Sequence, residues 1–172
     1  MFQDEAGFGR INKPKRCWCP KGRRPAVPSQ MIREYTYAYA AVSPHDGEMV
    51  SLILPYTNAN CMSLFLEEVS NRYPEDYILM VMDRAAWHTA KTLIIPKNIE
   101  IFPLLPYSPE LNPAEQIWDE TREKGFKNEV FNSLALVEDR LCQTLLDLEN
   151  DPRRVRSVTG WEWIISMNLN AN

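Results

Sequence analysis

The segment Tyr77-Ile-Leu-Met-Val-Met-Asp83 decides the fold of this chain. Its first six residues form an uninterrupted apolar run of strand length, which predicts a strand buried on both faces of a sheet. Asp83 follows directly, so a carboxylate stands where this strand ends. The segments on either side therefore determine the kind of sheet and what the carboxylate faces.

Strand-forming segments come before this central strand. Tyr35–Val42 and Glu48–Tyr56 are β-prone, and Ser43-Pro-His-Asp-Gly47 between them has the composition of a turn, with His45 at the surface. The two runs predict a hairpin. A further short strand is expected from Phe2 to Phe8, followed by an irregular loop or loose hairpin from Lys13 to Ser29.

Helices are expected on both sides of the central strand. Apolar residues at helical spacing predict two of them, and Asn112 as N-cap before Pro113 predicts another. Before the central strand, one helix carries Met62, Phe65, Leu66, Val69 and Tyr73. After it come a helix from about Trp87 to Ile95, a strand from Ile99 to Leu105 and a helix from Pro113 to about Lys124. A last helix carries Leu134, Val137, Leu141, Leu145 and Leu148. At 172 residues, the chain fits one domain. This order predicts an α/β fold, with a mixed five-stranded sheet flanked by helices.

Charge is distributed unevenly. The net charge is −4, yet residues 6–33 hold eight basic and no acidic residues, so this segment carries +8 and the remainder −12. Such asymmetry is typical of a phosphate-contacting arm on an acidic body, although a solvated basic loop explains it equally well. The candidate DNA-binding residues are Lys13, Lys15, Arg16, Trp18, Lys21, Arg23 and Arg24. Trp18 either stacks on a base or anchors its loop.

Composition argues against a membrane protein, a secreted protein and a zinc-binding protein. No apolar run approaches the about 20 residues of a membrane helix, and no signal-peptide pattern opens the chain, so a cytoplasmic protein is expected. Cys17, Cys19, Cys61 and Cys142 are sparse and irregularly spaced. We therefore expect four reduced thiols rather than a zinc site.

Three acidic residues adjoin regular elements: Asp4 in the first strand, Asp83 after the central strand, and Glu115 in the first turn of a helix. If the fold gathers them, their oxygens suit Mg²⁺ or Mn²⁺ and two-ion phosphodiester chemistry. Each also has a structural explanation. Asp4 is then a solvated acid, Asp83 a helix cap, and Glu115 a capping-box residue behind Asn112. The combination of all three favours the metal site.

Two further polar residues lie near these acids. Glu5 points to the opposite face from Asp4 in a regular strand, so we do not assign it to the site. His88, expected near the start of the helix after Asp83, is an auxiliary candidate. It either hydrogen-bonds a phosphate or metal-bound water, or packs beneath the site as a structural histidine.

The segment Leu105-Pro-Tyr-Ser-Pro-Glu-Leu-Asn-Pro-Ala-Glu-Gln-Ile-Trp118 is a long and specific motif. It resembles the L-P-x-Y-S-P-x-L-N-P-x-E-x-x-W block of DDE transposases, in the bacterial insertion-sequence branch of the mariner superfamily. Phe2–Phe8 is similar to the first-Asp block of that family, and Asp83 with His88 to the second. Trp18–Pro25 resembles its W-x-x-x-G-x-x-P segment.

The resemblance implies a ribonuclease-H-like fold and two Mg²⁺ or Mn²⁺ ions held by Asp4, Asp83 and Glu115. The implied reaction is DNA cleavage and strand transfer at transposon ends, by a homodimer in the synaptic complex. Arg84 stands where the family commonly has Asn. Family members carry helix-turn-helix domains before the first Asp, whereas three residues precede Asp4 here. We therefore expect residues 1–172 to form a single catalytic domain without a helix-turn-helix region. Such a fragment is a second reading frame that needs fusion to an upstream one, an engineered piece or a decayed element. In the first case an upstream-frame DNA-binding domain is a partner.

Two functional hypotheses follow. The first is a metal-dependent transposase catalytic domain. The alternative is a catalytically inactive remnant that binds DNA or a full-length transposase. A housekeeping nuclease of the same fold is less favoured, because Ser108-Pro-Glu-Leu-Asn-Pro113 points to transposases.

Overall fold

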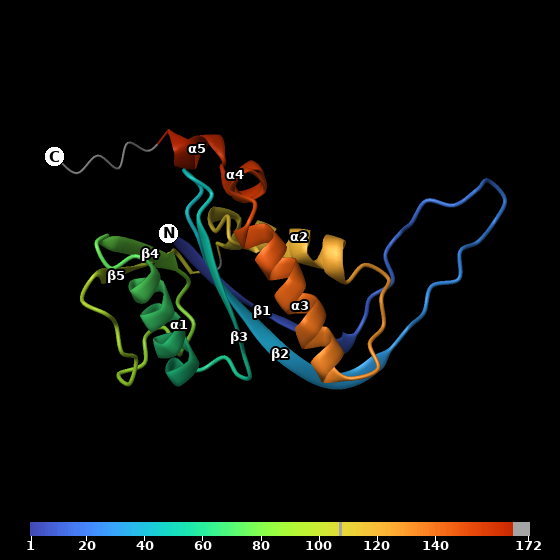
Figure 1. Cartoon of the computed structure of the whole chain (residues 1–172), viewed down its shortest axis with the longest axis horizontal. Coiled ribbons are helices and arrows are strands. Elements are labelled where there is room, and N and C mark those ends of the chain that lie inside the picture. The colour runs from blue at the N-terminus through green and yellow to red at the C-terminus, as the bar shows by residue number, and fades with distance from the viewer. Residues whose placement is uncertain (107, 167–172) are drawn as a thin grey trace.

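A mixed five-stranded sheet organises the computed structural model, which describes residues 1–106 and 108–166. The strand order is β3-β2-β1-β4-β5 (Figure 1). The strands are β1 (Phe2–Ile11), β2 (Met31–Val42), β3 (Met49–Leu54), β4 (Ile78–Met82) and β5 (Ile99–Pro103). The first three are antiparallel neighbours, whereas β4 runs parallel to β1 and to β5. The predicted α/β fold is confirmed; residues 167–172 of the expected single domain lie outside the described residues.

Helix α1 (Ala59–Arg72) covers one face of the sheet. Asn58 caps it by accepting a hydrogen bond from the Cys61 N–H at 2.9 Å. Its buried side chains pack on Tyr39 and on β4. This helix confirms the amphipathic pattern of the sequence and places an apolar layer behind β1 and β4.

The opposite face is covered by helices that follow β5. The short helix η1 (Pro109–Leu111) leads into α2 (Glu115–Gly125), α3 (Leu134–Glu149), α4 (Pro152–Thr159) and α5 (Glu162–Ile165). Trp118 of α2 is 1% exposed and packs edge-on against Phe8 of β1. The core on this face therefore fixes α2 directly over β1.

Two expectations were wrong in detail. The helix expected from Trp87 to Ile95 does not form, and turns occupy this segment because the side chains of Trp87 and His88 are drawn inward to Glu5. Strand β4 is not buried on both faces. Leu79 is 38% exposed, since the helices on that face pack over β1–β3 rather than over β4.

A long irregular loop joins β1 to β2 and projects away from the sheet and helices (Figure 1). We call residues 12–30 the basic arm. Its root is fixed where the Gln30 N–H donates to Asn12 Oδ1 at 2.7 Å, and where the Lys15 N–H donates to Asn128 Oδ1 at 2.8 Å. The predicted irregular segment is confirmed, although β1 and β2 both extend further toward it than expected.

Other expectations concern single residues and the membrane. All four cysteines are free, as predicted. His45 lies exposed in the turn between β2 and β3. Among the described helices, none has both the length and the apolar character needed to cross a bilayer.

Candidate active site

A cavity of about 370 Å³ opens beside the start of α2. Asp4 of β1, Asp83 after β4 and Glu115 at the start of α2 all line it. The rest of the lining comes from residues 84–85, 104–106, 108–109 and 112. The fold therefore brings together the three predicted acidic residues, which lie far apart in the sequence.

The parallel pairing of β1 with β4 explains why Asp4 and Asp83 meet. Phe2 of β1 is paired with Val81 of β4, and both pack in the core on the α2–α3 face. Side chains alternate between the two faces along a strand, so the residue two positions after Phe2 and the residue two positions after Val81 point to that same face. Asp4 and Asp83 occupy those positions.

The Asp4 carboxylate is held by α2. Its Oδ2 accepts a hydrogen bond from Trp118 Nε1 at 2.7 Å. Burial and the nearby Glu115 carboxylate nevertheless raise the pKa of Asp4 to about 7, against the lowering effect of the Trp118 bond. An acid in this setting ionises fully at neutral pH only when a cation compensates its charge.

Glu115 does not act as the capping-box residue that the sequence also allowed. The Asn112 N–H bonds to the Pro109 carbonyl, while Asn112 Oδ1 accepts from the Ala114 N–H at 3.1 Å. The Glu115 carboxylate lines the cavity instead. Burial raises its pKa, with Arg122 opposing and the charges of Asp119 and Asp83 adding to the effect.

Asp83 rests on His88. His88 Nδ1 lies 2.8 Å from Asp83 Oδ1 and 3.0 Å from the Asp83 carbonyl, and His88 Nε2 lies 2.8 Å from Glu5 Oε1. His88 is 6% exposed and is absent from the cavity lining, which favours the structural alternative for this residue. Glu5, which sequence reasoning left out, therefore contacts the site through His88.

The ring of His88 carries a positive charge in this arrangement. Each ring nitrogen faces only acceptor oxygens, so both nitrogens must donate. Burial opposes protonation, but hydrogen bonds with Asp83 and Glu5 raise the pKa of His88 to about 10. The hydrogen bond from His88 in turn lowers the pKa of Asp83.

The carboxylates of Asp4, Asp83 and Glu115 are the type of ligand that a divalent cation binds. Carboxylate oxygens are the ligands that Mg²⁺ prefers, and Mg²⁺ is usually held by one or two carboxylates, with water and phosphate oxygens completing its coordination. Among residues 1–106 and 108–166, no three His, Cys, Asp or Glu side chains are close enough to hold one ion together. The three carboxylates therefore share one cavity without forming a three-ligand cluster for a single ion.

The basic arm is spatially separate from the cavity. All seven candidate DNA-binding residues are exposed, and Trp18 is fully so, but none lines the cavity. The Lys15 ammonium lies 3.8 Å from Glu123, which partly neutralises it. The arm leaves β1 roughly 23 Å along the strand from Asp4, at about 3.3 Å per residue.

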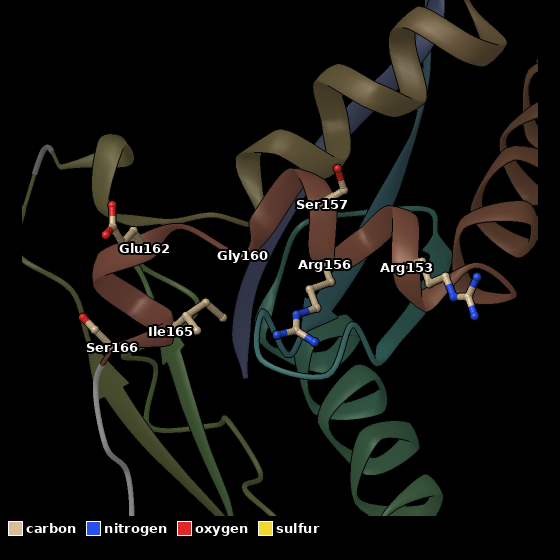
Figure 2. A pocket seen from close by; sticks show the side chains of 7 residues that line it. All are labelled: Arg153, Arg156, Ser157, Gly160, Glu162, Ile165 and Ser166. Atoms are coloured by element: carbon tan, nitrogen blue, oxygen red, sulfur yellow. The ribbon is translucent and has the colours of Figure 1, made fainter.

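A larger cavity of about 610 Å³ lies between α4 and α5 and contains none of the predicted site residues (Figure 2). Arg153, Arg156, Ser157, Gly160, Glu162, Ile165 and Ser166 line it. Glu162 is the one acidic residue in this lining, so the cavity holds no cluster of acids. The cavity at Asp4 is therefore the better candidate for an active site.

Comparisons with solved structures support the fold. The chain is similar to a pre-cleavage Mos1 transpososome, with a TM-score of 0.59 and 16% identity, over 93% of this chain and 55% of that one. It is also similar to the Mos1 mariner paired-end complex with Mn, with a TM-score of 0.58 and 17% identity, over 93% and 55%. The catalytic domain of Mos1 mariner transposase matches with a TM-score of 0.52 and 13% identity, over 92% and 81%. The chain thus spans about half of the longer Mos1 chains and shares their ribonuclease-H-like architecture.

Sequence comparisons reach further than the fold. An uncharacterized protein, y4pE/y4sA of Sinorhizobium fredii (strain NBRC 101917 / NGR234), is 30% identical over 130 residues, which are 75% of this chain and 96% of that protein. The family model described as DDE superfamily endonuclease matches residues 1–137, a span that contains Asp4, Asp83 and Glu115. The chain therefore belongs to the DDE superfamily endonuclease family.

Proposed function

We propose that residues 1–172 form the catalytic domain of a DDE transposase that cleaves DNA and transfers strands at the ends of an insertion sequence. One observation carries this proposal. Asp4, Asp83 and Glu115, from three separate elements, line one cavity in a chain of the DDE endonuclease family. Phosphodiester chemistry at such acids depends on a divalent metal.

The proposed ligands are the three acids, and the ions are Mg²⁺ or Mn²⁺, with two ions at the site. Bound metal would activate a water or 3′-hydroxyl and stabilise the leaving oxygen. The protein supplies the donors. Trp118 orients the Asp4 carboxylate and His88 orients that of Asp83. The pKa values of Asp4 and Glu115 are raised, so their ionised forms are disfavoured in the metal-free protein. A bound cation would stabilise the ionised forms, which supports this assignment.

Arg84 is the proposed contact for the DNA phosphate at the cavity. It lines the same cavity, and its Nε donates to the Leu104 carbonyl at 3.1 Å. That bond fixes the side chain and leaves both terminal nitrogens to bind two oxygens of one phosphate. Among the described residues, no acid forms an ion pair with Arg84. Arg84 thus gives the acidic cavity a cationic edge.

The basic arm is the proposed second DNA contact. Residues 16–30 of the arm contain exposed cations and no acidic residue. The exposed ring of Trp18 is free to stack on a base. A separation of roughly 23 Å along β1 corresponds to about 7 base pairs at about 3.4 Å each. The arm is therefore suited to hold a duplex whose scissile phosphate lies at the cavity.

The proposed partners are transposon-end and target DNA and a second copy of the chain. The likeness to Mos1 paired-end complexes is the ground for a dimer in the synaptic complex. We assign sequence-specific recognition of the ends to an upstream DNA-binding domain in the same complex. The setting is the cytoplasm, where the DNA of a bacterial insertion sequence lies.

Nicking of supercoiled plasmid tests the proposal. We expect nicking with Mg²⁺ or Mn²⁺, none with EDTA, and none in Asp83→Asn under any condition. Asp76→Asn, an exposed acid near the other end of β4, is the control and should nick normally. DNA binding without nicking in any metal would favour the inactive remnant. Nicking that resists EDTA and persists in Asp83→Asn would refute the metal-dependent site.

A further inference from the structure

Glu5 is a carboxylate buried on the α1 face of the sheet, where 6% of its side chain is exposed. Its cross-strand neighbour is Tyr39, which is fully buried in the apolar layer beneath α1. Burying a carboxylate costs several kcal/mol unless the charge is paired and hydrogen-bonded. The partners of Glu5 therefore explain why the fold tolerates it.

Those partners lead toward the cavity. Glu5 Oε1 accepts from Trp87 Nε1 at 3.2 Å and lies 2.8 Å from His88 Nε2. His88 is itself buried, and its other ring nitrogen lies 2.8 Å from Asp83 Oδ1. Glu5, His88 and Asp83 thus form a continuous hydrogen-bonded path from the α1 face of the sheet to the cavity.

Asp83 needs such support because β4 has already ended at Met82. The next regular element is β5, so no strand ladder fixes Asp83, and its side chain is 58% exposed. Its Oδ1 accepts from the Ala85 N–H at 2.9 Å and from His88. Both contacts use Oδ1, which leaves Oδ2 for a ligand in the cavity.

We infer that Glu5 is a positioning residue for Asp83 and acts through the ring of His88. This inference rests on the proposed function, in which Asp83 is a metal ligand. Glu5 touches neither metal nor DNA. It holds the imidazole in the orientation that fixes one Asp83 oxygen and directs the other into the cavity. Outer partners of metal ligands are typically worth about 10–100-fold in metal affinity or activity.

A purely structural role makes a different prediction. If Glu5 only fastened the turns of residues 83–98 to the sheet, its loss would lower stability without a specific effect on metal binding. Glu149 provides a matched control. Its side chain is 12% exposed and bonds to Ser51 and Arg72, away from the cavity.

The experiment compares Glu5→Ala and Glu5→Asp with Glu149→Ala. The Asp variant keeps the buried charge but withdraws the acceptor from His88 by one methylene, so it serves if the Ala variant does not fold. Mn²⁺ affinity is measured by calorimetry, kcat by nicking and Kd by binding to a short duplex. We expect both Glu5 variants to lower Mn²⁺ affinity and kcat by about 10–100-fold while Kd for DNA is unchanged. Glu149→Ala should change none of these.

Equal effects in Glu149→Ala, or unchanged Mn²⁺ affinity and kcat in both Glu5 variants, would overturn the inference while the proposed function stands. The carboxyl ¹³C signal of Asp83 gives a readout independent of activity. It should shift in Glu5→Asp and stay in place in Glu149→Ala. If wild-type protein fails to nick DNA, the proposed function fails, and this signal alone decides whether Glu5 positions Asp83. An unmoved signal would refute the inference.

Discussion

Asn112 Nδ2 donates a hydrogen bond of 2.9 Å to the backbone carbonyl of Gln3. This bond ties the strand residue just before Asp4 to the loop that starts α2. The same side chain accepts from the Ala114 N–H, one residue before Glu115. Asn112 is 3% exposed, so both bonds are shielded from water. One buried amide therefore sets the distance between the strand that carries Asp4 and the helix that carries Glu115.

The first prediction concerns this amide. Asn112→Asp keeps the acceptor for Ala114 but removes the donor to Gln3, and should cost about 1–3 kcal/mol of unfolding free energy. Nicking should fall at least about tenfold, because Asp4 and Glu115 are no longer held at one spacing. Urea unfolding and plasmid nicking measure the two effects. Asn98→Ala, which breaks amide bonds to Tyr73 and Asp76 away from the cavity, should destabilise the protein without specific loss of nicking.

The second prediction is a pH dependence of the metal-free protein. The unfolded chain releases the Asp4 proton near pH 3.8, and the folded chain only near pH 7. The contribution of this carboxyl to stability therefore falls as the pH rises through that window. Asp4→Asn should be more stable than wild type at pH 8 by on the order of 2–4 kcal/mol, and equally stable below pH 4. Urea unfolding across this pH range checks the difference.

Added Mn²⁺ supplies the control for the Asp4 prediction. A cation at the cavity favours the ionised carboxylate, so wild type should gain stability at pH 8 and Asp4→Asn should gain less. A difference between the two proteins that is the same at pH 4 and pH 8 would show that Asp4 is not the titrating group.

The third prediction concerns Arg84. Arg84→Ala should weaken binding of a short duplex by about tenfold, because it removes a charge-assisted hydrogen bond to a phosphate, while Mn²⁺ affinity is unchanged. Arg84→Lys should recover part of the affinity, since it restores charge without the bidentate geometry. Equal DNA affinity in wild type and Arg84→Ala, measured by fluorescence anisotropy, would exclude Arg84 from the DNA interface.

The fourth prediction concerns the basic arm. Reversing three exposed charges, in Arg16→Glu, Lys21→Glu and Arg23→Glu combined, should lower duplex affinity strongly. It should also reduce the slope of log K against log salt by about 0.9 for each phosphate that the arm no longer neutralises. Lys97→Glu changes an exposed cation outside the arm and should leave the slope unchanged. A triple variant with the wild-type salt slope would favour the solvated-loop explanation.

Local sequence patterns predicted most of the fold. The hairpin of β2 and β3 and helices α1 and α3 follow from side-chain periodicity and turn composition, whereas β4 forms as expected but is buried on one face only. The helix expected over residues 87–95 does not form, because the side chains of Trp87 and His88 hydrogen-bond with the buried Glu5 instead. Helix α4 was missed, although Asp151 before Pro152 is a capping signal.

The acidic cavity was predictable because each acid adjoins an element whose placement the pattern specifies. The role of Glu5 was not. Strand alternation correctly places it on the face away from Asp4, but its link to the cavity runs through His88, which reaches it across the sheet from a non-helical segment. The contact between Glu5 and His88 depends on how the turns pack against the sheet. Turns have no periodic sequence pattern from which such packing could be predicted. A polar residue beside Asp4 within a buried strand was the one available signal.

Calorimetric titration of Mn²⁺ shows most directly whether Asp4, Asp83 and Glu115 each contribute to divalent-metal binding at this cavity. We expect wild type to bind Mn²⁺, and Asp4→Asn, Asp83→Asn and Glu115→Gln each to weaken binding by at least about tenfold. Glu110→Gln, an acid of η1 outside the cavity lining, should bind as wild type does. Mn²⁺ binding that is unchanged by all three cavity substitutions would show that these acids are not metal ligands.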